Sequence, residues 1–151
     1  MNKNDIVTLY CYNDWARHRI LAQAARVSPA QYVAAAPAPH GSLRGTLVHT
    51  LAAEAAWRQR WQGDSPVALL NETDLPAFDA LHGRWEQEAQ TLHDFVAALT
   101  DDDLNRTIHY KTTKGIAKAN VLWHLMTHVV NPWDFPGATT APSIAPRLPC
   151  C

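Results

Sequence analysis

Apolar residues recur every three or four positions in four stretches of the chain, which is the spacing of an amphipathic helix. The four predicted helices run over residues 4–26, from Ser42 to Gly63, from Asp74 to Leu99, and from about Lys118–Asn120 to Asn131. Ser42 and Asp74 are expected N-caps, because short polar side chains accept hydrogen bonds from the first turn of a helix. Gly63 is an expected C-terminal stop.

The segments between and after these helices carry different signals. Ser28-Pro29 is expected to end the first helix, and the proline-containing stretch 29–41 is expected to be a linker. Residues 105–118 alternate β-branched and polar types around Lys114-Gly115, which predicts a short hairpin. Residues 132–151 hold five of the ten prolines and have no helical or strand periodicity, so an irregular tail is expected.

The predicted fold is therefore all-α: an antiparallel four-helix bundle, with a hairpin between its third and fourth helices. The bundle is expected to be one domain over residues 1–131, followed by the tail 132–151. The fourth helix has only about 13 residues, whereas the second and third have about 20 or more. Their core stripes are therefore expected to lack a partner over about one third of their length.

Composition excludes several classes of protein. The 13 basic and 14 acidic residues give no field that would hold nucleic acid, so no polyanion partner is expected. The N-terminal residues have neither a signal-peptide core nor a membrane span. Cys11 and the adjacent Cys150 and Cys151 lack the spacing of a disulfide framework or a zinc knuckle. A cytoplasmic protein is therefore expected.

Three of the eight histidines, His49, His124 and His128, lie in predicted helices on or near the apolar side. His124 and His128 are four residues apart, so their rings lie one helical turn apart and could bind one zinc or nickel ion. A ligand from a facing helix would complete such a site, and His49 is the candidate. The alternative is that each histidine is simply hydrogen-bonded in the core or at the edge of the bundle. The remaining five are expected to be solvated: His18, His40, His82, His93 and His109.

Three groups of residues carry a resemblance to a known family. They are the opening Tyr12-Asn13-Asp14-Trp15-Ala16, the helical Leu47-Val48-His49 with Glu54 and Trp57, and the sequence His128-Val129-Val130-Asn131. Over about residues 5–131 the chain resembles the DinB family, part of the DinB/YfiT-like metalloprotein superfamily. The resemblance implies a helical bundle in which His49 is the first of three histidine ligands of a divalent metal.

The chain departs from the family pattern directly after Asn131. Pro132 and Pro136 occupy the positions at which the resemblance implies the second and third ligands, and proline offers no metal lone pair. His128, and then His124, are the remaining substitutes, although a shift of one turn moves a ligand by about 5.4 Å. Codons for residues 132–139, read one base later, can spell His-Gly-Thr-Phe-Arg-Gly-Gln, close to the family motif. A shifted reading frame is therefore one hypothesis for the tail, and natural divergence is the other.

The resemblance implies a metal-dependent enzyme, a transferase or hydrolase that acts on a small molecule together with a low-molecular-weight thiol. A bound zinc or nickel ion would lower the pKa of that thiol. With two ligands missing, this activity is expected to be weakened or lost, with the ion itself absent in the extreme case. The alternative is a non-catalytic, stress-associated structural or dimeric protein. A homodimer is compatible with the resemblance, although the sequence alone does not predict it. No membrane partner is expected, and the sequence identifies no catalytic residue.

Overall fold

The structure is a computed structural model that describes residues 1–38 and 40–130. Helices make up 63% of this part of the chain, and the remaining regular structure is one small two-stranded sheet. A mostly helical fold is therefore confirmed. In order, the elements are α1 (Lys3–Ala24), α2 (Pro29–Val33), α3 (Leu43–Trp61), α4 (Phe78–Ala98), α5 (Asp101–Asn105), β1 (Thr107–Lys111), β2 (Ala117–Val121) and α6 (Leu122–Val130).

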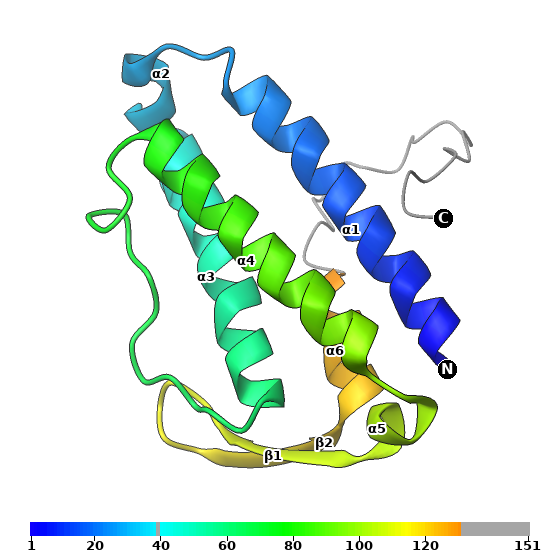
Figure 1. Ribbon diagram of the computed structural model, residues 1–151. Helices are drawn as coiled ribbons and strands as arrows, with labels where there is room; N and C mark the ends of the chain where they lie inside the picture. The colour runs from blue at the N-terminus through cyan, green and yellow to red at the C-terminus, as the bar shows by residue number, and fades with distance from the viewer. Residues whose placement is uncertain (39, 131–151) are drawn as a thin grey trace.

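Helices α1 and α3 each pack against both α4 and α6. Figure 1 shows α1, α3 and α4 as long neighbouring helices, with α2 near one end and the β1–β2 hairpin across the other. Helix α6 is much the shortest of the four that pack together, with nine described residues. Asn131 and the predicted tail 132–151 lie outside the described residues.

Helix α3 begins and ends where the sequence predicts. The Ser42 side chain accepts a hydrogen bond from the Gly45 N–H at 2.9 Å, so Ser42 is the N-cap. The helix ends at Trp61, and Gly63 follows with φ of 100°, a left-handed conformation that glycine adopts without a steric penalty. The predicted cap and stop are both confirmed.

The prediction that Ser28-Pro29 only ends a helix and opens a linker is wrong. Helix α1 does end before it, at Ala24, but Ser28 caps the new helix α2. The Ser28 hydroxyl accepts from the Gln31 N–H, and the Gln31 side chain accepts from the Ser28 N–H, which forms a capping box. Pro29 fits the first helical position because its missing N–H has no partner there in any helix.

Two other predicted helix starts are also wrong. Asp74 does not cap α4, because this helix begins at Phe78. The Asp74 carboxylate instead accepts a hydrogen bond from the Asn71 N–H at 2.8 Å. Pro76 explains the delay, because a proline disfavours the helical conformation of the residue before it. The last helix begins at Leu122 rather than near Lys118–Asn120, because β2 continues through Val121.

The predicted hairpin is confirmed. Strands β1 and β2 are antiparallel, with Thr107 opposite Val121 and Lys111 opposite Ala117. Gly115 in the connecting turn has φ of 76°, which a residue with a Cβ adopts at a cost. The hairpin turns the chain back toward the ends of α3 and α4, so α6 can enter between α1 and α3.

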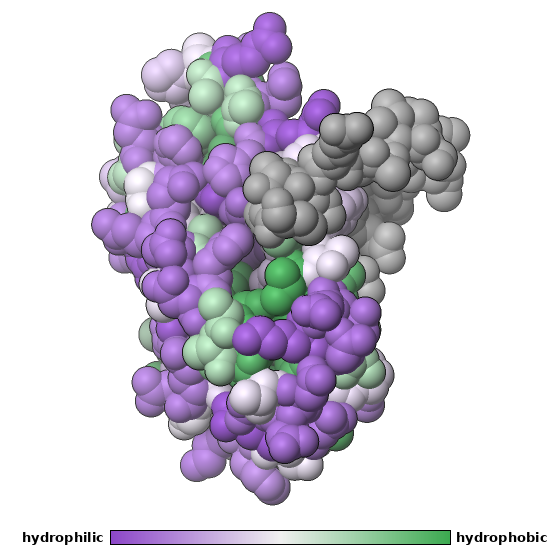
Figure 2. All heavy atoms as spheres, turned by 45° about the vertical axis from the view of Figure 1, so that its right-hand side comes forward, coloured by the Kyte–Doolittle hydropathy of each residue, from purple (hydrophilic) through white to green (hydrophobic). Residues whose placement is uncertain are grey.

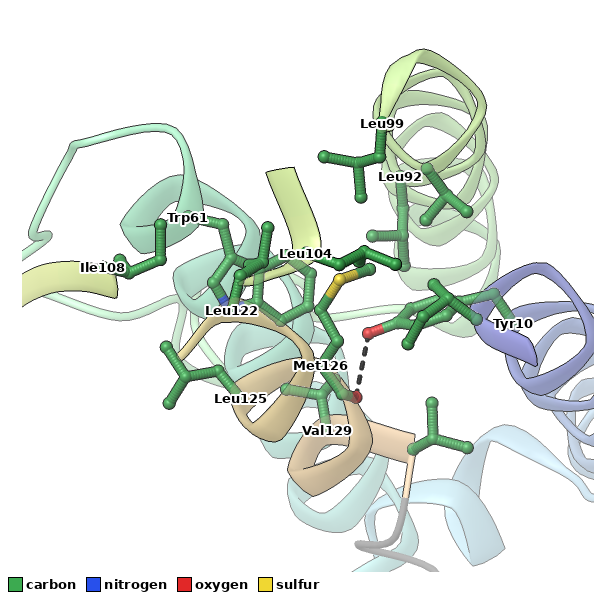
Figure 3. Close-up of a cluster of buried hydrophobic side chains, with 13 residues drawn as sticks. Tyr10, Trp61, Leu92, Leu99, Leu104, Ile108, Leu122, Leu125, Met126 and Val129 are labelled. Carbon is green, nitrogen blue, oxygen red and sulfur yellow. Dashed lines mark hydrogen bonds between the residues drawn. The ribbon is translucent and has the colours of Figure 1, made fainter. Parts of the chain in front are cut away.

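The core consists of two apolar clusters. The first joins α1, the end of α3, α4, α5 and α6 with the hairpin. In Figure 3 the Tyr10 hydroxyl donates across it to the Met126 carbonyl oxygen at 3.1 Å. The second cluster contains no described residue of α6. Its α3 members nevertheless are buried, with Leu47 at 2% and Leu51 at 0% exposure. The expectation that the α3 stripe lacks a partner is wrong there, because Tyr32 of α2 helps to cover it.

Most of the surface seen in Figure 2 is hydrophilic, with a smaller apolar area between polar side chains. Across residues 1–38 and 40–130, no helix combines the length and apolar character that a membrane crossing requires.

Candidate functional site

His49, His124 and His128 all lie on the surface rather than on the apolar side of their helices. His49 follows the buried Val48 on α3, and the two α6 histidines occupy the face opposite the buried Leu125 and Met126. The prediction of a near-core position is therefore wrong for all three. It failed because each histidine adjoins buried positions in the sequence, and periodicity alone does not fix where the buried face of a helix ends.

His49 stacks on a second histidine that the sequence placed among the solvated ones. The rings of His40 and His49 have centroids 3.9 Å apart and planes inclined by 21°. His40 comes from the loop before α3 and His49 from the second turn of that helix, so the pair joins two segments. His40 is exposed as predicted, but it is also part of the site.

Gly45 makes the approach of this loop possible. A Cβ atom at Gly45 would lie 2.2 Å from the His40 carbonyl oxygen and 2.8 Å from Oε1 of Glu72. Real Cβ atoms do not come this close to a backbone oxygen, so only glycine fits between the loop and the segment that carries Glu72. Gly45 thus places His40 beside His49, one helical turn further along α3.

A surface pocket of about 420 Å³ lies beside this histidine pair. Its polar side is formed by His40, His49 and Glu72, and an ion pair between Arg44 Nε and Glu72 Oε2 at 2.8 Å fixes the glutamate. The pocket is lined by His40, Gly45, Val48, His49, Leu70, Asn71, Glu72 and Thr73. Its volume suits a small molecule.

Partial burial, and then the neighbouring His40, lower the pKa of His49 from its usual value. Both effects disfavour the imidazolium form, so the ring is neutral at physiological pH. A neutral imidazole has a nitrogen lone pair for a metal ion or for a proton, which is the state that either role requires.

The other two candidate ligands lie elsewhere. His128 packs edge to face against Trp57 at 5.7 Å between centroids, and His124 against Trp123 at 3.9 Å. Trp57 is eight residues beyond His49, or about 12 Å along the helix axis at 1.5 Å per residue. The structure thus brings His49 together with His40, and His128 together with Trp57.

The described residues do not fit a complete three-ligand metal centre. Within residues 1–38 and 40–130, no three histidine, cysteine, aspartate or glutamate side chains are grouped so that they could hold a metal ion. Pro132 and Pro136, at the positions where the resemblance implies two ligands, lie outside this range. Metal binding by His49, His128 and His124 stays a prediction.

Glu54, quoted above with His49, has a different role. It is 4% exposed, and its two carboxylate oxygens accept from Asn13 Nδ2 at 2.9 Å and from Trp85 Nε1 at 2.7 Å. These bonds join α3 to α1 and α4. Burial raises the pKa of Glu54, against the effect of the two hydrogen bonds. Sequence reasoning missed this network, although Asn13 within an apolar stripe was a signal of a buried partner.

The remaining histidines are mostly exposed, as predicted: His18, His40, His82 and His109 are exposed and His93 is half-buried. Three of them gather at the contact of α1 with α4, around two carboxylates. His18 Nδ1 lies 3.3 Å from Asp14, and His82 Nε2 lies 3.5 Å from Glu86. Arg17 already bridges Asp14 and Glu86, each at 2.6 Å, so both acids have a cationic partner.

Comparison with protein families shows which family the chain belongs to. The model of the DinB family matches residues 1–131, which include the whole described fold. The chain belongs to the DinB family. The match ends at the residue before Pro132, where the sequence departs from the expected ligand pattern. No curated protein matches the chain.

Proposed function

We propose that this DinB protein descends from a divalent-metal-dependent enzyme and that its own metal-dependent activity is weakened or lost. The ancestral chemistry is of the thiol-transferase type, on a small-molecule substrate with a low-molecular-weight thiol. The corresponding fold is the antiparallel four-helix bundle of the family, in a cytoplasmic protein that forms homodimers. Zinc or nickel is the expected ion for a histidine site.

The observation that carries this proposal is the setting of His49. It lies at the family's ligand position, beside a pocket of about 420 Å³, with its pKa lowered so that the ring is neutral. A histidine at this position supports descent from a metal-binding ancestor. His128 packs against Trp57 and not beside His49. This position supports a weakened metal site, because coordination tolerates displacements of only about 0.2 Å.

Metal analysis of the purified full chain tests the proposal. Protein loaded with zinc or nickel and then desalted is expected to keep less than one ion per chain, and His49→Ala is expected to abolish that retention. His109→Ala is the matched control, because His109 is exposed on β1, away from the pocket, and its loss should leave retention unchanged. Retention that is equal in wild type and His49→Ala would refute a site at His49.

The second candidate is a non-catalytic, stress-associated structural or dimeric protein. It is favoured by the packing of His124 and His128 against tryptophans, as ordinary surface aromatic contacts. Metal analysis separates the two candidates, because both are compatible with a homodimer in sedimentation analysis. A stable dimer without any metal retention supports the structural role, whereas retention that depends on His49 supports the first proposal.

We also propose the shifted reading frame as the origin of residues 132–151. The end of the family match at residue 131 supports a change of sequence at this point. Sequencing of independent genomic DNA across codon 131 tests it. An inserted or deleted base near codon 131 would establish the shift. An in-frame sequence that encodes the same residues would leave natural divergence as the explanation.

A further inference from the structure

Arg60, in the last turn of α3, is a buried cation without an anionic partner among residues 1–38 and 40–130. The residue is 7% exposed, and its Nε has no hydrogen-bond partner. No carboxylate in the described part of the chain pairs with it, and Tyr110 is the one ionisable group that acts on its charge. The other buried arginine of the fold, Arg17, is paired with both Asp14 and Glu86.

Aromatic rings take the place of a carboxylate around Arg60. Its guanidinium carbon lies 4.8 Å from the centroid of Trp57 and 5.8 Å from that of Tyr110. The two rings are themselves in edge-to-face contact at 5.3 Å. Both aromatic residues are half-buried, and the exposed His128 packs on Trp57. The cation therefore lies one layer of side chains below the surface.

This environment does not compensate the charge. Burial lowers the pKa of Arg60, which means that the protein disfavours its charged form relative to water. Cation–π contacts and the negative end of the helix dipole offset part of this cost, but they leave the Nε–H group without an acceptor. A buried charge that lacks a partner among the described residues is a candidate binding site for an external ion.

We propose that Arg60, Trp57, Tyr110 and His128 form a binding site for a small oxyanion, a carboxylate or a phosphate group. The planar guanidinium presents paired N–H donors that match two oxygens of either group. The imidazole of His128 supplies a further polar group at the rim. Arg60 is about 16 Å along α3 from His49, so its guanidinium lies away from any metal bound at His49.

NMR of the arginine Nε–Hε groups tests the site directly. Wild-type protein is titrated with inorganic phosphate and, separately, with succinate, against sodium chloride at matched ionic strength. The Arg60 resonance is expected to shift saturably with at least one of the two anions, and the stronger response identifies the ligand class. No saturable shift of Arg60 with either anion overturns the proposal.

Variants test whether the guanidinium itself is responsible. Arg60→Gln is expected to lower the affinity for the anion at least tenfold. Arg19→Gln is the matched control, because Arg19 also lies over a ring, Trp15 at 5.2 Å, but is exposed. The affinity of Arg19→Gln for the anion should equal that of wild type. Equal binding by Arg60→Gln and wild type refutes the site.

Thermal unfolding provides a second test, which does not depend on obtaining folded Arg60→Gln protein. The anion is expected to raise the Tm of wild type above that in matched chloride, because a ligand that binds only the folded state stabilises it. Arg60→Lys keeps the charge but not the paired donors, so most of this increase should disappear. An increase of the same size in Arg60→Lys overturns the assignment to the guanidinium.

Discussion

Two residues of one short motif on α3, His49 and Glu54, face opposite sides of the helix and differ in exposure and in hydrogen bonding. Five positions correspond to a rotation of about 140° on a helix. Glu54 points inward, where both carboxylate oxygens are hydrogen-bonded to neighbouring helices. His49 points outward, where it contacts another histidine beside a pocket. A motif can thus combine a residue that holds helices together with a residue that lies on the surface beside a pocket.

The comparison predicts that stability depends on the inward residue. Glu54→Ala is expected to lower the free energy of unfolding by about 3 kcal/mol, because it removes the acceptor of two buried donors at about 1–3 kcal/mol each. Glu72→Ala is the control: it removes the half-buried partner of Arg44 and should cost less than about 1 kcal/mol. Urea unfolding measures both. A smaller loss for Glu54→Ala than for Glu72→Ala would contradict the division between the two faces.

The outward side depends on a close backbone approach, which a methyl group would break. Gly45→Ala is expected to displace the loop of His40 and to destabilise the protein by about 1–3 kcal/mol, since the new Cβ would lie 2.2 Å from a carbonyl oxygen. Gly83→Ala is the matched control on α4, where a Cβ meets nothing within 4 Å. That change should stabilise by about 0.5–1 kcal/mol. Urea unfolding of both variants should therefore give opposite signs.

The same contrast explains what the sequence could predict. Local signals worked: Ser42 capped α3, Gly63 ended it, and the hairpin formed around Gly115. They failed where two signals competed. Ser28-Pro29 is equally a stop for one helix and a start for the next, and the Pro76 constraint overrode the cap expected at Asp74.

The site was less predictable than the fold, because its contacts join distant segments. His49 was identified from its position in a motif, but its contact with His40 depends on a loop path that Gly45 permits. Likewise, nothing in the spacing of Glu54 indicates that Trp85 lies beside it. Periodicity gives the face of a residue on its own helix, and it does not give the partner across the interface.

Acid titration extends the comparison to the contact of α1 with α4. The hydrogen bond from Arg17 lowers the pKa of Glu86. A carboxyl group with a lowered folded-state pKa adds stability above its unfolded pKa, about 4.3, and loses it as the pH falls through the folded value. Wild type should therefore be slightly more stable than Glu86→Gln at pH 7, and the two should converge below that folded value. A difference that persists in strong acid would show that the ion pair is not its cause.

The smallest expected effect concerns the histidine pair itself. Because burial and His40 lower the pKa of His49, its ring should titrate in NMR below the usual value of about 6.5. The folded state then binds fewer protons than the unfolded state, so the contribution of His49 to stability falls as the pH drops below about 6.5. His40→Ala removes the second of the two causes and should move the His49 titration part of the way back toward 6.5. An unchanged titration in that variant would mean that burial alone lowers the pKa of His49.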